Sequence, residues 1–337
     1  MKNVIFIVLI FLFVQCTNKN DTVGYYFDVC QDLYLEEIKY PEILGDPMQM
    51  LKKDSILFIN DYFGDSLIQM YNLNSHKVER KLVSKGNGPN ELIPPLEIQY
   101  QNNKLWILSR PLHLLYNISL NEMSPLNSLS KNGVVKSESD CFVVLPDNKI
   151  VFSGFWDNRY AFGEISNLQS VKEFGEYPNF WNEESSIPQH VKAMFHQCRF
   201  AVNKKRQKLV SCSYFVLEIF DIKGDVMPEL AFRKQLGRYT YDYIATEQIR
   251  TKMRTGCDPV TIDVVATDEY LYLLMQDSDN KKNRNIAVID WSGEPVKLLK
   301  SGKRILCFTI DEKERKGYCA VEDGEIKLMS FDLDEWE

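Results

Sequence analysis

The chain has 337 residues, and 45% of them are hydrophobic, which is enough to bury a substantial core in one or two domains. Lys and Arg together number 40 against 47 Asp and Glu, so the formal net charge is −7 at pH 7. No basic stripe runs along the sequence to attract phosphates. We therefore expect no nucleic-acid partner.

The first sixteen residues, MKNVIFIVLIFLFVQC, have the pattern of an export signal. Lys2 supplies a positive charge, residues 4–14 form an apolar run, and Cys16 follows. The run is shorter than the roughly 20 residues that cross a bilayer as a helix. The pattern resembles a bacterial lipoprotein signal, in which the cysteine becomes the lipidated first residue of the mature protein. Residues 13–15 (FVQ) are larger than the small residues usual before that cysteine.

We accordingly expect a signal peptide over residues 1–15, lipidation at Cys16 and a polar tether over 16–26. The protein would be exported and membrane-anchored, in the outer membrane on its periplasmic or surface face. Ordinary secretion and an uncleaved anchor are the alternatives.

A short pattern recurs six times and predicts the fold. Two apolar or aromatic residues precede Asp or Asn, and another apolar residue and a turn follow. The copies are MYNLNS (Asn72), LYNISL (Asn117), a degenerate FGEISN (Glu164), IFDIKG (Asp221), VIDWSG (Asp290) and SFDLDE (Asp332). They lie about 52 residues apart on average, near the roughly 40–50 residues of a four-stranded propeller blade.

Each copy follows runs of strand length and apolar or alternating character. We therefore predict an all-β, six-bladed propeller of four-stranded antiparallel blades, forming a single domain over residues 27–337. The strand-like segment 25–40 is expected to close the ring by adding a strand to the final blade. The Asp or Asn of each copy is expected to bond its own backbone and favour the turn. Trp291, next to Asp290, is expected to pack.

The stretch SKGNGPNE, residues 84–91, raises the question of a phosphate loop. A P-loop places its lysine directly after the last glycine, whereas here the lysine precedes the glycines. Pro89 removes a backbone donor, and Glu91 would repel a phosphate. We expect Gly86, Gly88, Pro89 and Glu91 to form a structural turn.

Two long insertions interrupt the repeat. Residues 177–200 have loop composition in their first half, and residues 237–259 predict a short helix over 244–256, with Thr246 as its cap and Gly256 as its stop. Long insertions in a short-looped fold are often functional. The alternative is that they only cover a blade edge.

Taken together, GNGPNE and the C-terminal stretch around Asp290, Trp291 and Gly293 resemble the TolB-like six-bladed β-propeller lipoproteins of Bacteroidetes-type bacteria, which are related to NHL-type propellers. The resemblance covers roughly residues 30–334. It implies an extracytoplasmic, membrane-tethered propeller that serves as a binding protein more often than as an enzyme. It carries no catalytic residue over to this chain.

No catalytic or metal-binding set is recognisable. The seven cysteines after Cys16 form no CxxC pair, and His190 and His196 are six residues apart, which does not match a helical zinc pair. No G-x-S-x-G elbow is present. We expect no cofactor and no metal, with the cysteines mainly as buried free thiols.

Aromatic and arginine side chains in loops are the candidate ligand contacts, because aromatic faces stack on sugars and peptides and arginine binds carboxylates. The candidates are Trp156, Arg159, Trp181, Tyr241 and Arg254. Packing between blades is the alternative for these residues. The expected function is non-enzymatic binding of an envelope protein, peptide or glycan through one propeller face. The alternative is a hydrolase or lyase with a polar or metal site in the central channel.

Overall fold

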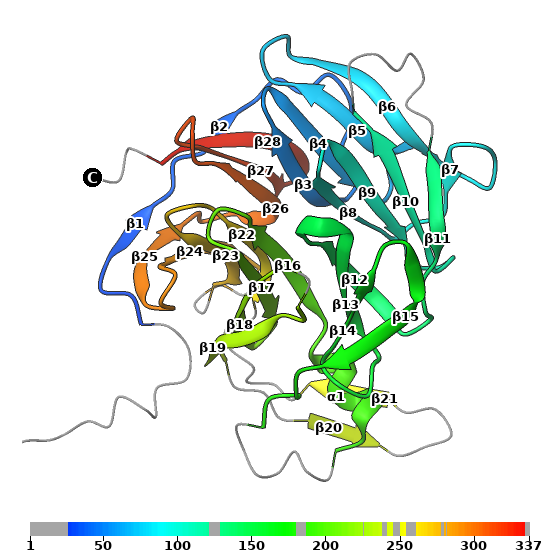
Figure 1. Cartoon of the computed structure of the whole chain (residues 1–337). Helices are drawn as coiled ribbons and strands as arrows, with labels where there is room; N and C mark the ends of the chain where they lie inside the picture. The colour runs from blue at the N-terminus through cyan, green and yellow to red at the C-terminus, as the bar shows by residue number, and fades with distance from the viewer. Residues whose placement is uncertain are drawn as a thin grey trace, which may run out of the picture.

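A computed structural model gives the fold in Figure 1, in which six sheets follow one another around a ring. The expected signal peptide, Cys16 and most of the expected tether lie outside the described residues. The structure describes residues 26–120, 129–179, 187–224, 226–237, 241–244, 250–253, 261–277, 280 and 282–333.

Each sheet is a blade whose four main strands are antiparallel and follow the chain from the centre outward. The first blade adds a short fifth strand, β7, parallel to β6. The strands of the first three blades are β3 (Pro47–Lys53), β4 (Ile56–Asp61), β5 (Ser66–Asn72), β6 (Lys77–Lys85) and β7 (Glu91–Leu92); β8 (Leu96–Gln101), β9 (Lys104–Ser109), β10 (Leu114–Ser119) and β11 (Ser130–Val134); and β12 (Ser139–Val144), β13 (Lys149–Gly154), β14 (Tyr160–Glu164) and β15 (Asn167–Phe174).

The remaining blades follow the same order, with three sequential strands in the sixth. Their strands are β16 (Cys198–Asn203), β17 (Lys208–Ser213), β18 (Val216–Asp221) and β19 (Glu229–Gln235); β22 (Thr261–Ala266), β23 (Leu271–Gln276), β24 (Arg284–Ile289) and β25 (Pro295–Lys300); and β26 (Arg304–Asp311), β27 (Lys316–Asp323) and β28 (Glu325–Asp332). The prediction of six four-stranded antiparallel blades is confirmed.

The start of the chain closes the ring at two places. β2 (Glu36–Glu37) pairs antiparallel with β28 and completes the sixth blade, as the sequence predicted. β1 (Cys30–Asp32) pairs parallel with β25 and extends the fifth blade, which the sequence did not predict. Between them, the Leu33 amide donates to the Lys300 carbonyl at 2.8 Å. Strands from the two ends of the chain therefore share the last two blades.

The hydrophobic core is divided into six clusters, and each joins two neighbouring blades. One cluster, for example, packs Phe58 of the first blade with Ile107 of the second, and another packs Tyr71 of the first with Tyr318 of the sixth. Alternating apolar residues place a side chain on both faces of every blade, and each face is buried only by its neighbour. Five of the six described cysteines are buried, and Cys30 is exposed.

The six copies of the repeated pattern occupy equivalent positions. Each lies in, or directly after, the third strand of its blade. Asp290 Oδ1 accepts the amides of Ser292 and Glu294, both at 2.9 Å, and Asn72 Oδ1 accepts the Asn74 amide at 2.8 Å. At these two positions the predicted bonding of Asp or Asn to its own backbone is confirmed.

The GNGPNE segment folds back on itself between β6 and β7. The Glu91 carboxylate accepts the Gly88 amide at 2.8 Å, and the Glu91 amide donates to the Gly88 carbonyl at 3.1 Å. A Cβ on Gly86 would lie 2.1 Å from Glu91 Oε2, and Gly86 has a φ of 156°. The glycines therefore leave room for the Glu91 carboxylate, and this carboxylate already accepts the Gly88 amide that a bound phosphate would need.

The prediction of a helix over 244–256 is wrong. The described parts of that insertion form two strands, β20 (Tyr241–Ile244) and β21 (Arg250–Met253), paired antiparallel with Tyr241 opposite Met253. Aromatic and β-branched residues in YDYI and RTKM favour strands, and a hairpin satisfies their backbone groups. Thr246 and Gly256, the expected cap and stop, lie outside the described residues.

The α-helix that is described lies in the other insertion. α1 (Gln189–Phe195) buries Val191, Ala193 and Phe195, and Pro188 precedes its first turn. A short 3-10 turn also occurs at Pro146–Asn148. In the part of the chain that the structure describes, no helix is both long and apolar enough to cross a membrane.

Leu33 tests the closure of the ring. It is 6% exposed and packs in the cluster between the fifth and sixth blades, whereas the adjacent Tyr34 is 70% exposed. We expect Leu33→Ala to lower the free energy of unfolding by about 2–4 kcal/mol. Tyr34→Ala should change it by no more than about 0.5 kcal/mol. Urea unfolding measures both, and equal effects would contradict a role of this segment in closure.

A double-mutant cycle tests the self-closed GNGPNE loop. Gly86→Ala should destabilise the protein by about 1–3 kcal/mol, because the new methyl group displaces the Glu91 carboxylate. The same substitution should cost less in a Glu91→Ala background, where that carboxylate is gone. Urea unfolding of the four proteins gives the coupling energy, and additive effects would show that the two residues do not depend on each other.

Candidate functional site

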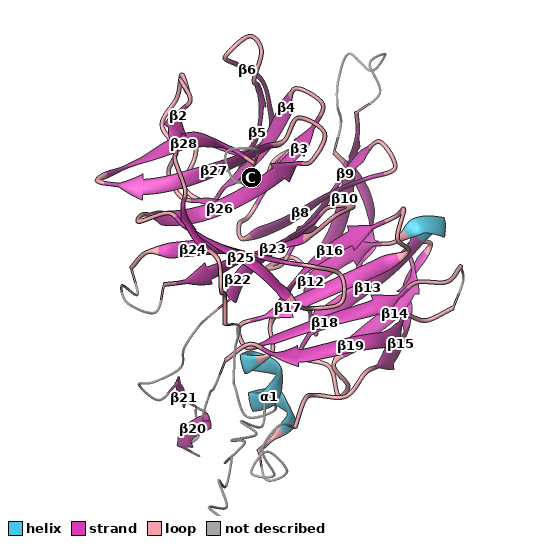
Figure 2. Cartoon of the chain, turned by 90° about the vertical axis from the view of Figure 1, so that its left-hand side faces the viewer, coloured by secondary structure: helices cyan, strands magenta, loops and turns pink. Residues whose placement is uncertain are grey.

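The two insertions join the same end of the propeller. The innermost strands β3, β8, β12, β16, β22 and β26 all begin at one end of the propeller, which we call the entry end. The connection after β15 leads into β16, and the connection after β19 leads into β22. Figure 2 shows α1, β20 and β21 at one edge of the molecule, away from β3 and β4. The long connections therefore reach the start of the two innermost strands that carry Arg199 and Asp263.

A central channel of about 230 Å³ is lined by all six innermost strands. Two of the three described glutamines that line it, Gln49 and Gln99, are bonded to backbone. Gln49 Oε1 accepts the Ile98 amide at 2.9 Å, and Gln99 Nε2 donates to the Val144 carbonyl at 3.2 Å. These bonds join the first blade to the second and the second to the third, so the amide side chains hold neighbouring innermost strands together.

The charged groups of the channel are also largely paired. Arg199 of β16 forms an ion pair with Glu97 of β8, on a different side of the ring. At the opposite end of the channel, the buried Lys52 ammonium pairs with Asp311 and lies 3.1 Å from a Glu314 carboxylate oxygen. These pairs connect non-adjacent or closing blades, which indicates a structural use.

Two further pockets continue the channel outward at the entry end. A throat of about 250 Å³ shares Arg199 and Asp263 with the channel. A larger vestibule of about 1000 Å³ shares Ile262, Arg284 and Arg304 with the throat. Vestibule, throat and channel thus form one path from solvent to the axis, widest at the entry end.

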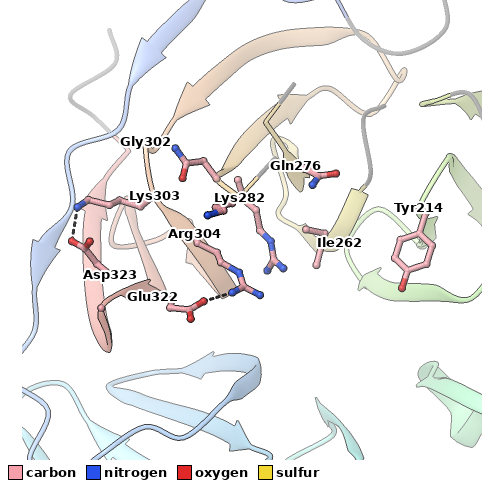
Figure 3. A pocket seen from close by; sticks show the side chains of 12 residues that line it. Tyr214, Ile262, Gln276, Lys282, Gly302, Lys303, Arg304, Glu322 and Asp323 are labelled. Atoms are coloured by element: carbon pink, nitrogen blue, oxygen red, sulfur yellow. Dashed lines mark hydrogen bonds and ion pairs between the residues drawn. The ribbon is translucent and has the colours of Figure 1, made fainter. Parts of the chain in front are cut away.

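Most of the side chains that line the vestibule are polar or charged, as Figure 3 shows. Lys303 and Asp323 form an ion pair of 2.5 Å on one side, next to the pair of Arg304 with Glu322. Tyr214 lies on the other side, with 37% of its surface exposed. The amide of Thr261 donates to the Tyr214 carbonyl at 3.0 Å, which fixes this loop of the fourth blade against β22.

Arg284 lines both the vestibule and the throat and is held by backbone. Its Nη1 donates to the Ile305 carbonyl at 2.7 Å and to the Leu306 carbonyl at 3.3 Å. Burial, and then the charge of Arg304, lower the pKa of Arg284 below its ordinary value. The guanidinium is therefore fixed in place, with a positive charge that its surroundings do not fully compensate.

Asp263 lies where the throat meets the channel. Burial raises the pKa of its carboxyl to about 6, although the charge of Arg199 acts in the opposite direction. One of its oxygens accepts the Val264 amide at 2.9 Å. Asp263 therefore changes charge near neutral pH, inside the path that leads to the axis.

Arg159, a candidate ligand contact, is 1% exposed. Its Nε lies 3.3 Å from the fully buried Glu218 carboxylate, and its Nη1 donates to the His196 carbonyl. Arg233 approaches the other oxygen of Glu218 at 2.7 Å. The cluster joins the third and fourth blades, which supports the packing alternative for Arg159.

Trp156, another candidate contact, is not among the described residues that line the vestibule. Trp156 is 3% exposed, and its carbonyl accepts the Tyr177 hydroxyl at 3.2 Å. Tyr241 lies in β20, and Trp181 and Arg254 lie outside the described residues. Trp291, expected to pack, does so: it is partly buried against the cluster between the fourth and fifth blades, and its indole donates to the Thr267 carbonyl at 3.2 Å.

Among the described residues, no group of three or more His, Cys, Asp or Glu is placed to hold a metal ion. The vestibule residues were not identified from the sequence. Arg284 and Arg304 begin strands in RNIAVI and RILCFTI, and Asp263 lies inside the apolar run TIDVVA. These positions share one sequence feature that could have pointed to the site: a charged residue in or beside an apolar strand, repeated in neighbouring blades.

Asp263 gives a pH-dependent prediction. Because its folded pKa of about 6 exceeds the ordinary value of 3.8, ionisation of Asp263 destabilises the fold as pH rises through 6. Asp263→Asn should therefore match the wild type below about pH 4 and exceed its free energy of unfolding by up to about 3 kcal/mol at pH 8. Urea unfolding across this range tests it, and a difference independent of pH would refute the assignment.

Comparisons with known proteins agree with this architecture. A protein from Bacteroides fragilis described as exported is similar in structure, with a TM-score of 0.58 and 12% identity over 92% of this chain and 98% of that one. A member of the DUF4221 family from Bacteroides vulgatus gives a TM-score of 0.54 and 12% identity, over 92% and 97%. No curated protein matches. The family model described as TolB-like 6-blade propeller-like matches residues 30–313, and the chain belongs to this family of TolB-like six-bladed propellers.

Proposed function

We propose that this protein is an exported, lipid-anchored envelope protein that binds a protein, peptide or glycan through the entry end of its propeller, without catalysing a reaction. The observation that carries the proposal is the vestibule of about 1000 Å³, which opens at the end that both long insertions join. Concave sites lined by a few convergent polar groups are the usual places for ligands. The likeness to a protein described as exported supports the location.

The state of the channel supports binding without catalysis. Glu97 is paired with Arg199, and Gln49 and Gln99 are bonded to backbone. Side chains with these partners connect innermost strands of different blades and so stabilise the ring. A lipid anchor at Cys16, followed by a short tether, would keep the propeller at the outer membrane, on its periplasmic or surface face.

One observation favours the alternative of a hydrolase or lyase. The raised pKa of Asp263, about 6, suits a general acid or base near neutral pH. Glycoside hydrolysis needs a second carboxyl at a set separation, and the nearby Glu97 is held in its ion pair with Arg199. Turnover of an ester, lactone or glycoside panel that is lost in Asp263→Asn would establish the enzyme instead.

Blocking the vestibule tests the binding proposal. In a Cys30→Ser, Cys257→Ser background, Lys282→Cys places a thiol on the exposed rim of the vestibule, and Lys205→Cys places one on an exposed turn at the opposite end. Each is coupled to a bulky polyethylene-glycol maleimide, and binding is measured on arrays of envelope peptides and glycans.

The label at position 282 should reduce binding of the array ligands by about tenfold or more, because it fills the approach to the site. The label at position 205 should leave binding unchanged. Equal binding by the two labelled proteins would move the site away from the entry end and refute the proposal.

A further inference from the structure

Four cations among the described residues line the vestibule, and Lys282 is exposed at its rim. Lys303 and Arg304 each have a carboxylate partner, Asp323 and Glu322 respectively. Arg284 is bonded to two backbone carbonyls, and no carboxylate among the described residues forms an ion pair with it. Among the described residues, Arg284 is therefore a fixed guanidinium that no carboxylate contacts directly, although the more distant charges of Glu322 and Asp263 also act on it.

This arrangement favours an anion from outside. A partly buried cation without a partner is unfavourable, and a carboxylate that reaches a guanidinium can accept two parallel hydrogen bonds. The two carbonyl bonds already fix the orientation of Arg284, so little side-chain freedom would be lost on binding. Arg304 lies close enough to lower the pKa of Arg284, and a single anion would reduce that repulsion too.

The same space also offers acceptors. Asp46 and Asp263 line the throat together with Arg284 and Arg304. Neither carboxylate forms an ion pair with those arginines among the described residues, and burial raises the pKa of both acids. An anion without hydrogen-bond donors would be repelled by them in their charged form. A ligand that carries hydroxyl groups beside its anionic group would donate to them.

We propose that the vestibule is a subsite for a carboxylate-bearing sugar unit, such as a uronate within an oligosaccharide. This inference rests on the proposed function and names the class of its ligand. The sugar carboxylate is placed at Arg284, its hydroxyls face Asp46 and Asp263, and the exposed ring of Tyr214 offers a surface on which a further sugar unit stacks.

The lining argues against an apolar ligand. Ile262 is the single aliphatic side chain among the described residues that line the vestibule, so apolar peptide side chains have no pocket among them. A neutral sugar would satisfy the acids and leave Arg284 without an anion. A guanidinium and two carboxylates that form no ion pair with one another among the described residues select a ligand that has both an anion and hydroxyl donors.

Calorimetry with the mature protein tests this inference. The ligands are a galacturonate tetrasaccharide, a neutral galactose tetrasaccharide, a sulfated tetrasaccharide of the same length and an acidic tetrapeptide. The galacturonate should bind most tightly, and the neutral analogue should bind about tenfold more weakly, because it lacks charge-assisted hydrogen bonds. Affinity for the galacturonate should fall as salt is raised.

Substitutions at Arg284 test whether the sugar carboxylate binds there. Arg284→Gln should weaken galacturonate binding by about tenfold, and Arg284→Lys, which keeps the charge and loses the planar fork, should fall between it and the wild type. Arg315→Gln makes the same charge change at a turn of the opposite end and should leave the affinity unchanged. Thermal unfolding by circular dichroism identifies any variant that binds weakly because it is unfolded, and Arg284→Lys then carries the test.

Four results would overturn the inference. They are equal binding of neutral and acidic sugars, a sulfated sugar that binds as tightly as the uronate, binding of the peptide alone, and an Arg284→Gln variant that is folded and binds normally. Each leaves the proposed function intact if a label at position 282 still blocks an array ligand. If that label blocks nothing, the proposed function itself fails.

Discussion

The structure depends on a single constraint, which is that no blade can bury its own faces. Each four-stranded blade carries apolar side chains on both sides, and the six clusters each lie between two blades. An open row of blades would expose one face at each end, so the ring must close. β1 and β2 provide this closure without a covalent link, since they pair with β25 and β28.

Closure also determines where binding can occur. Six innermost strands converge on the axis, and polar side chains there are useful to the fold because they bond the neighbouring strand, as Gln49 and Gln99 do. Ion pairs such as Glu97 with Arg199 connect strands across the ring. The channel is thus occupied by bonds that hold the blades, and space remains at the entry end, where the path widens to the vestibule.

Much of the fold was predictable because it repeats. The Asp or Asn after two apolar residues recurs at the third strand of every blade, since each blade makes the same turn there. The helix expected over 244–256 was wrong at β21, because Thr246 and Gly256 suggested helix boundaries while the aromatic and β-branched residues around them favoured a hairpin. β1 was missed because only the assembled ring shows which blade edge a three-residue strand will reach.

The site was harder to predict than the fold because it depends on what each arginine meets. Arg159 and Arg284 look alike in the sequence, since each stands at the start of a strand. In the folded chain Arg159 lies against Glu218 from the next blade, so its charge is satisfied and it joins two blades. Arg284 meets two carbonyls and the like charge of Arg304. Arg159 and Arg284 therefore differ in whether the ring brings a carboxylate into contact, as it does for Arg159 with Glu218, 59 residues further along the chain.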